Sequence, residues 1–138
     1  MILRVFIDSD VILDVALARE PFLHQSRQVL AILENGRAIG HVSPNIVTNL
    51  YYILRKAGGD AKARNFLGLL LKFLTVVPVD HTIVLNALGS EFLDFEDAVQ
   101  NYSAVENQCS TIVTRNREDY KASELVVLTP SEFIGDFT

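Results

Sequence analysis

Cysteine is nearly absent from this sequence. Cys109 is the only one in 138 residues, which excludes an internal disulfide and a zinc site built from cysteines. A lone cysteine favours a reducing compartment, so we expect a cytoplasmic protein. The three histidines, His24, His41 and His81, are scattered without the spacing of metal ligands. The sequence also contains no recognisable Ser/His/Asp or Cys/His arrangement for nucleophilic catalysis.

Long apolar runs and an excess of positive charge are also missing. The longest apolar stretch, FLGLLLKFLTVVPV, is interrupted by Lys72 and Pro78 and is too short to span a bilayer. The opening residues, MILRVFID, lack the features of a signal peptide, so we expect a soluble protein without membrane association. The net charge of −5 argues against a protein that coats duplex nucleic acid. A local nucleic-acid site is still compatible with it, because bound cations partly reverse the charge of carboxylates.

The composition is that of an ordinary globular domain. Hydrophobic residues make up 49% of the chain and charged residues 21%, and no segment is repetitive or low in complexity, so disorder is not expected. A chain of this length buries roughly two-thirds of the surface that its unfolded form exposes. We predict a single domain over residues 1–138.

Short apolar segments alternate with helical patterns along the chain. The predicted strands are LRVFI, AIGHV, VVPV, STIVT and LVVL. The predicted helices span about residues 11–18, 22–34, 44–56, 60–74, 80–88 and 94–107, with a last one behind Thr129. Apolar strands that alternate with helices imply a mostly parallel sheet covered on both faces. We therefore predict an α/β protein with the three-layer α/β/α arrangement.

Several carboxylates stand where these predicted strands and helices meet. Asp8 and Asp10 come directly after the first strand, and Asp119 lies just beyond STIVT. Asp94 and Asp97 are three residues apart at a helix start, so they share one face of that helix. Parallel sheets bind ligands at the carboxyl ends of their strands, so we expect these acids around one cleft. They would repel one another unless cations were bound, and carboxylate oxygens suit Mg²⁺ or Mn²⁺ rather than zinc.

Each motif also has a purely structural interpretation. Asp8 or Ser9 is a suitable helix cap. Asp94 with Asp97 resembles a capping box, and RNRED by itself is a typical polar turn. The positive charges of that turn are equally compatible with solvated side chains. These alternatives stay open when the motifs are taken one at a time.

The ordered set of motifs resembles the PIN-domain family, the fold of many metal-dependent ribonucleases, including the VapC-type toxins of toxin–antitoxin pairs. FIDSDVILD is similar to the opening Asp motif of that family, DFEDAVQ to the helix with its third acid, and IVTRNREDY to its final strand and loop. The resemblance covers nearly the whole chain. It implies that Asp8 is the first acid, Asp97 the third and Asp119 the fourth.

The resemblance also implies roles for the neighbouring residues. A Mg²⁺ or Mn²⁺ ion would be held by Asp8, Asp94, Asp97 and Asp119. Asn49 stands where the family normally has a glutamate, and as a neutral oxygen ligand it would complete the catalytic set with weaker metal binding. The candidates for contacting the substrate are Ser9, Asp10, Thr114, Arg115, Asn116 and Arg117, with Lys121 beside them.

The implied activity is hydrolysis of RNA phosphodiester bonds, with an antitoxin protein as a further partner. FLGLLLKFL is apolar around most of its circumference, so we predict that it forms a homodimer contact with Tyr51 and Tyr52. One alternative is a non-catalytic PIN-like module that binds RNA or protein. Another is a haloacid-dehalogenase-type phosphatase, whose Asp-x-Asp opening FIDSDVILD also resembles, with Ser43 imitating its second motif. The acidic pair of that family follows a late strand, whereas DFED precedes STIVT.

Overall fold

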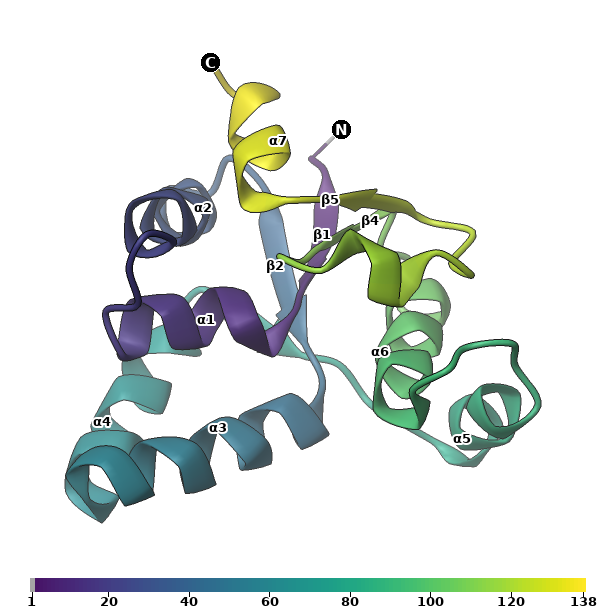
Figure 1. The fold of residues 1–138 in the computed structure, drawn as a ribbon, viewed down its shortest axis with the longest axis horizontal. Coiled ribbons are helices and arrows are strands. Elements are labelled where there is room, and N and C mark those ends of the chain that lie inside the picture. Colours follow the sequence, from purple (N-terminus) through teal and green to yellow (C-terminus); the bar gives the residue numbers. More distant parts are fainter. Residues whose placement is uncertain (1) are drawn as a thin grey trace.

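The computed structural model describes residues 2–138, so Met1 of the predicted domain lies outside the described residues. Five strands form one parallel sheet in the order β3-β2-β1-β4-β5. Strand β1 lies at its centre, between β2 and β4 (Figure 1). The strands are β1 (Arg4–Ile7), β2 (Ile39–Val42), β3 (Leu74–Val76), β4 (Thr111–Val113) and β5 (Val126–Leu128).

Helices cover both faces of this sheet. They are α1 (Ser9–Ala16), α2 (Leu23–Glu34), α3 (Pro44–Gly58), α4 (Asp60–Leu70), α5 (His81–Leu88), α6 (Phe95–Glu106) and α7 (Pro130–Gly135), with a 3₁₀ turn η1 (Arg117–Tyr120). Helices α1 to α4 and α7 pack on one face, and α5 and α6 on the other (Figure 1). This division follows from right-handed crossovers, because the chain moves outward from β1 to β3 and then crosses back to β4. The predicted three-layer α/β/α fold is confirmed.

The helix starts agree with the cap residues of the sequence. Ser43 accepts a hydrogen bond from the backbone N–H of Ile46, and Pro44 occupies the first turn of α3. Thr129 forms a capping box with Glu132 at the start of α7. Such caps satisfy backbone N–H groups that have no partner inside the helix. Local hydrogen bonding therefore explains why these helices begin where the sequence predicts.

The predictions for the segment between α4 and α5 were wrong in two respects. Helix α4 ends at Leu70 rather than near residue 74, and the third strand is Leu74–Val76 rather than VVPV. Leu74 pairs with Gly40 of β2, so this apolar run changes from helix to strand without a breaking residue. Pro78 has no backbone N–H to donate and lies beyond the strand.

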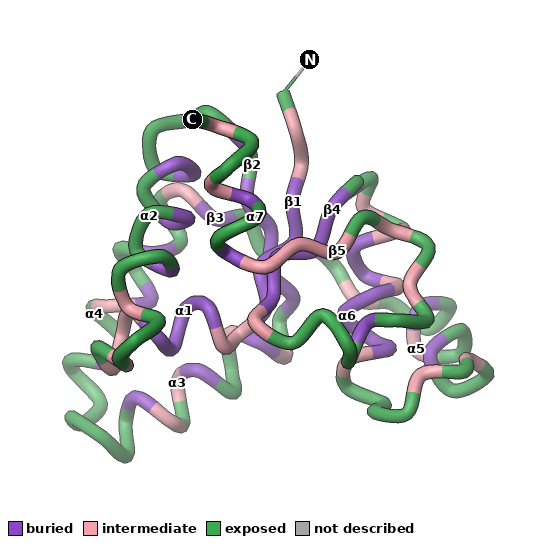
Figure 2. The backbone as a smooth tube through the Cα atoms, turned by 45° about the horizontal axis from the view of Figure 1, so that its top comes forward, coloured by how far each residue is buried: buried purple, intermediate pink, exposed green. Residues whose placement is uncertain are grey.

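The core lies between the sheet and the two helical layers (Figure 2). Val5, Phe6 and Ile7 of β1 are completely buried, as expected for the central strand of a covered parallel sheet. Gly40 allows close packing beside it, because a Cβ atom there would overlap the side chains of Leu74 and Leu33. Within residues 2–138, no helix combines the length and apolarity needed to cross a membrane.

Candidate active site

The central strand delivers Asp8 to the carboxyl edge of the sheet. Asp8 follows β1 directly and caps α1, and its Oδ1 accepts a hydrogen bond from the backbone N–H of Ser9 at 2.8 Å. The hydroxyl of Thr114, at the end of β4, donates to Oδ2 at 2.9 Å. Burial raises the pKa of Asp8, and the charge of Asp119 adds to that shift, while these hydrogen bonds oppose it. The expected cap is therefore real, and it also orients an acid with a perturbed pKa.

Asp10 is held from the opposite side by the loop after β4. It accepts hydrogen bonds from the backbone N–H of Arg115 at 3.2 Å and from the side-chain amide of Asn116 at 3.3 Å. Burial raises the pKa of Asp10 to about 7, and the nearby charge of Asp8 contributes in the same direction. Thr114 and Asn116 thus position the two acids of the opening motif through hydrogen bonds.

Helix α6 supplies the second pair of acids. Asp94 is the cap residue, and its Oδ1 accepts a hydrogen bond from the backbone N–H of Asp97 at 2.9 Å. The pKa of Asp97 is raised to about 7, mainly by burial. The negative charges of Asp8, Asp94, Asp119 and Glu96 contribute in the same direction. The charge of Asp8 acts on Asp97 across the gap between β1 and α6. The carboxylates of the two separate motifs therefore belong to one electrostatic cluster.

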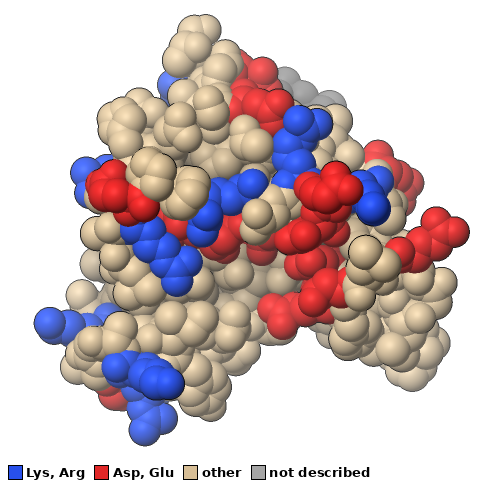
Figure 3. Space-filling model, viewed as in Figure 1, with Lys and Arg blue, Asp and Glu red and all other residues tan. Residues whose placement is uncertain are grey.

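Asp119 approaches the same cluster from η1. Asp94, Asp97, Glu118 and Asp119 line a pocket of about 110 Å³ between α6 and η1. Acidic side chains form a continuous band over this part of the surface (Figure 3). The sequence interpretation did not include Glu118, although it adjoins Asp119 in RNRED. Lys121 lies 3.3 Å from Glu118, so its charge is already paired at this rim.

A buried hydrogen-bond network behind the acids was also missed. Tyr120 is 1% exposed, and its hydroxyl donates to Oε1 of Gln100 at 2.6 Å. The same hydroxyl lies within hydrogen-bond reach of Asp8. Burial raises the pKa of Tyr120 far above its usual range, so it stays protonated. Gln100 follows Asp97 by three residues on α6, and that helical spacing was the available signal.

The acids offer the donor type that a hard divalent cation needs. Carboxylate oxygens suit Mg²⁺ or Mn²⁺. Burial is the main cause of the raised pKa values of Asp8 and Asp97, neighbouring carboxylates add to it, and a bound cation would oppose this rise. Across residues 2–138, however, no three acidic, histidine or cysteine side chains converge closely enough to hold one ion. The residues fit a cation in chemistry and charge, and binding requires the carboxylates to move together.

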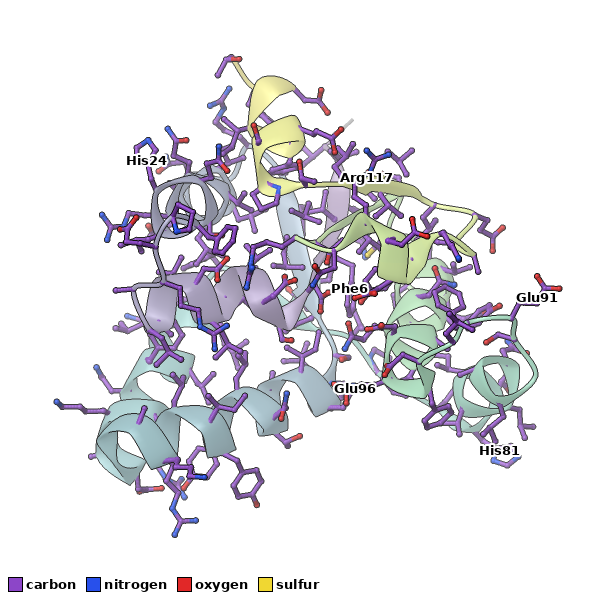
Figure 4. All side chains as sticks on the ribbon, in the orientation of Figure 1. Phe6, His24, His81, Glu91, Glu96 and Arg117 are labelled. Atoms are coloured by element: carbon purple, nitrogen blue, oxygen red, sulfur yellow. The ribbon has the colours of Figure 1, made fainter. Side chains whose placement is uncertain are left out.

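Asn49 lies on the second turn of α3, and its side chain is exposed. No hydrogen bond between Asn49 and the acids occurs within the described part of the chain. Asn45, one turn earlier on the same face, has a buried amide oxygen without a hydrogen-bond partner among residues 2–138. Glu96, at the start of α6, projects toward this end of α3 in the view of Figure 4.

Two of the predicted substrate-binding cations already have acidic partners. Nε of Arg115 lies 2.9 Å from the fully buried Asp14, and its guanidinium carbon lies 3.9 Å from the ring centre of Phe22. Arg117 lies 3.3 Å from Glu132 of α7, well away from Glu96 (Figure 4). The guanidinium groups of both arginines are therefore paired with acids that do not line the pocket between α6 and η1.

Residues 4–118 match the family model described as PIN domain. The chain belongs to the PIN domain family. Its acids also follow this assignment rather than the phosphatase alternative, because Asp94 and Asp97 open a helix that precedes β4. The PIN domain occupies most of the chain, from β1 to η1.

Known proteins similar to this PIN domain include a relative from Aquifex aeolicus (strain VF5) named Ribonuclease VapC1. The two are 28% identical over 135 residues, which cover 94% of this chain and 92% of the relative. VapBC2 from Rickettsia felis, solved bound to a DNA fragment from its promoter, aligns with a TM-score of 0.73 at 12% identity, over 92% of this chain and 98% of that chain. A toxin–antitoxin complex from Klebsiella pneumoniae aligns with a TM-score of 0.70 at 19% identity, over 91% and 97% of the two chains. At these identities the structural matches demonstrate the fold.

Proposed function

We propose that this PIN domain is a metal-dependent endoribonuclease that hydrolyses RNA phosphodiester bonds. The observation that supports this most directly is the electrostatic cluster of Asp8, Asp97 and Asp119, which come from three distant parts of the sequence. The relative named Ribonuclease VapC1 supports the same activity. The PIN fold carries this cluster at the carboxyl edge of its sheet, the usual ligand-binding edge of such folds.

The ion would be Mg²⁺ or Mn²⁺, held by Asp8, Asp94, Asp97 and Asp119. When bound, it would lower the pKa of a water molecule and stabilise charge on the phosphoryl oxygens. Thr114 and the backbone N–H of Ser9 hold Asp8 in orientation. Asn49 would supply a neutral oxygen ligand at the edge of the site.

The protein's own side chains would also hold the substrate. Arg115 and Asn116 follow β4 and donate hydrogen bonds to Asp10, and Arg117 begins η1. Their donors suit the phosphate oxygens of an RNA strand. The charge of the acids themselves repels phosphate, so these groups would act together with the metal ion.

Two protein partners are also proposed. The similarity to VapBC2 and to the Klebsiella complex supports an antitoxin partner for this chain. Exposed apolar side chains on α3 and α4, among them Tyr52 and Leu69, support a homodimer contact. The chain would then act as the toxin of a toxin–antitoxin pair.

Cleavage of RNA by the purified protein tests the proposed activity. We expect Mn²⁺ or Mg²⁺ to be required, and Asp8→Asn to slow cleavage by at least about tenfold. Asp136→Asn, an exposed change directly after α7, is the matched control and should leave the rate unchanged. Thermal melts give an independent measurement, since a ligand at a hundredfold excess over its dissociation constant adds about 2.7 kcal/mol of stability. If the RNA stays uncleaved and Mn²⁺ does not change the melting temperature of the protein, the non-catalytic alternative is favoured.

A further inference from the structure

A second pocket lies beside Asp10. It has a volume of about 290 Å³ and is formed where the start of α2, the loop after β4 and the start of α7 meet. Its lining consists of Phe22, Gln25, Ser26, Arg115, Asn116 and residues 129–131. The pocket is at the lower end of the range of about 300–1,000 Å³ for small-molecule sites, which suits one compact group.

Two residues that line the pocket also contact Asp10 of the opening acidic motif. Asn116 lines the pocket, and its side-chain amide donates a hydrogen bond to Asp10. Arg115 also lines the pocket, and its backbone N–H donates to the same carboxylate. Asp10 therefore connects the lining of this pocket with the opening acidic motif, beside which a polymer substrate would bind.

One side of the pocket is a platform formed by Arg115 and Phe22. The guanidinium of Arg115 lies over the Phe22 ring at 3.9 Å. Asp14, which accepts a hydrogen bond from Ser26 at 3.0 Å, fixes this arrangement through its ion pair with Arg115. Stacked guanidinium and aromatic planes are the surfaces on which unpaired bases stack.

The remaining lining offers hydrogen-bonding groups without negative charge. Gln25 and Asn116 carry amides, Thr129 and Ser131 carry hydroxyls, and none of the residues that line the pocket is an acid. The pocket between α6 and η1 has the opposite composition, with five acidic side chains in its lining. A group with a flat face and a polar edge, attached to a phosphate, suits this pocket without acids and not the acidic one.

We propose that this pocket binds one base of a single-stranded RNA substrate, next to the phosphate that is cleaved. The base stacks on the Phe22–Arg115 platform, and Gln25 and Asn116 hydrogen-bond to its edge. This inference rests on the proposed ribonuclease function for the identity of the polymer. It gives the enzyme a nucleotide preference at one position beside the cut.

Titration of the isotope-labelled protein followed by nuclear magnetic resonance tests the pocket without requiring cleavage. The probes are the four nucleoside 5′-monophosphates, with ribose 5-phosphate as the probe that lacks a base, all in chelator. We expect the amide signals of Gln25 and Asn116 to shift with at least one nucleotide and not with ribose 5-phosphate. Phe22→Leu should weaken binding about tenfold because stacking is lost.

Two exposed glutamines on α2 provide a matched pair that should fold equally well. Gln25→Ala should reduce the differences in affinity among the four bases, whereas Gln28→Ala, outside the pocket, should leave them unchanged. An unstructured RNA hexanucleotide should displace the bound mononucleotide.

Four results would overturn the base pocket. The first is that ribose 5-phosphate shifts the amide signals as much as the nucleotides do, and the second is that the shifts are confined to residues of the acidic pocket. The third is that Phe22→Leu and Gln25→Ala both leave the affinity for the nucleotides unchanged, and the fourth is that the RNA does not displace the mononucleotide. No step of the titration uses cleavage. If the protein binds the base but does not cleave RNA, the proposed ribonuclease activity is contradicted and the proposed base-binding pocket is supported.

Discussion

Thr114 links the acids of the opening motif through a single hydroxyl. It donates to Oδ2 of Asp8 at 2.9 Å, lies 3.5 Å from Asp10, and accepts the backbone N–H of Asn116 at 3.1 Å. The side chain is completely buried, so water cannot replace it. The positions of both carboxylates therefore depend on a residue more than a hundred positions away in the sequence.

The raised pKa of Asp97 predicts that the metal-free protein is more stable in mild acid. The pKa is about 7 in the folded protein and 3.8 in the unfolded chain, so folding favours the protonated form. Stability from this group is fully present below pH 3.8 and is lost as the pH rises through about 7. In chelator, the melting temperature should fall between pH 5 and pH 8, and this fall should be smaller in Asp97→Asn.

Asp136→Asn is the control for this experiment, because it removes a carboxylate outside the cluster. Its melting temperature should depend on pH as the parent's does. A parent protein whose stability rises over this interval would contradict the prediction. Saturating Mn²⁺ should reduce the fall, since a bound cation favours the charged carboxylates.

Asn49→Glu should raise the affinity for Mn²⁺. The new carboxylate adds negative charge near the proposed metal site, and a tenfold gain corresponds to about 1.4 kcal/mol. In chelator the same charge should lower the melting temperature through repulsion. Calorimetric titration of Mn²⁺ measures the affinity directly.

Thr48→Glu is the matched control, because it adds the same charge at the neighbouring exposed position of α3. It should change Mn²⁺ affinity less than Asn49→Glu. Equal affinities in the parent and in both folded variants would show that Asn49 does not substitute for the second acid.

The sequence predicted helix starts better than helix ends. Three helix starts carry a local signal, because their cap residues accept hydrogen bonds from the backbone of the first turn; these residues are Ser43, Asp80 and Thr129. The end of α4 has no such signal, because LLLKFL suits a helix and a strand equally and pairing with β2 decides between them. Strand order was equally inaccessible, since it depends on contacts between distant segments.

In the candidate site, too, the features that depend on local sequence motifs were predicted, and those that depend on contacts between distant residues were not. Asp8, Asp97 and Asp119 were predicted from motifs, and the structure brings their charges together. The placement of Arg115 against Asp14 and Phe22 was not predicted, because these partners lie about a hundred residues apart without a local pattern. Charge alone had suggested a solvated or substrate-facing arginine.

Gly40 and Gly68 should respond oppositely to the same substitution. In Gly40→Ala, the added methyl group would overlap Leu74 and Leu33, and such overpacking typically costs about 1–3 kcal/mol. In Gly68→Ala, the methyl group meets nothing within 4 Å and the residue lies inside α4, so stability should rise by about 1 kcal/mol. Urea unfolding measures both changes.

Each glycine variant is the control for the other, since both add one methyl group. A Gly40→Ala protein as stable as the parent would contradict the close approach of β2 to its neighbours. A destabilised Gly68→Ala would show that α4 has contacts outside the single chain.

Exposed apolar side chains occur on two opposite sides of the protein. Tyr52 and Leu69, on α3 and α4, are 63% and 51% exposed, and Leu88 on α5 is 65% exposed. Leu70, in contrast, is buried in the core at 3%. The predicted apolar helix therefore divides its leucines between the core and the surface, and only the exposed ones are available for a partner.

Leu69→Lys should dissociate the proposed homodimer, because it places a charge in an apolar contact. Light scattering at micromolar concentration should give a dimer for the parent and a monomer for this variant. Leu88→Lys changes a leucine on the other side that is even more exposed, and this variant should remain dimeric. A monomeric parent, or dissociation by Leu88→Lys instead, would contradict the predicted interface.

The central position of β1 has a consequence for protein synthesis. This strand is made first, yet its neighbour β4 begins only at Thr111, and Asp119 follows later still. A chain still growing on the ribosome thus carries Asp8 on a strand whose edge toward β4 is unpaired, without the hydroxyl of Thr114 that orients it. Translation products that stop before residue 111 would keep the opening motif and lack the assembled cleft. Premature termination of this chain should therefore release inactive fragments with an exposed strand edge, which are substrates for aggregation or proteolysis.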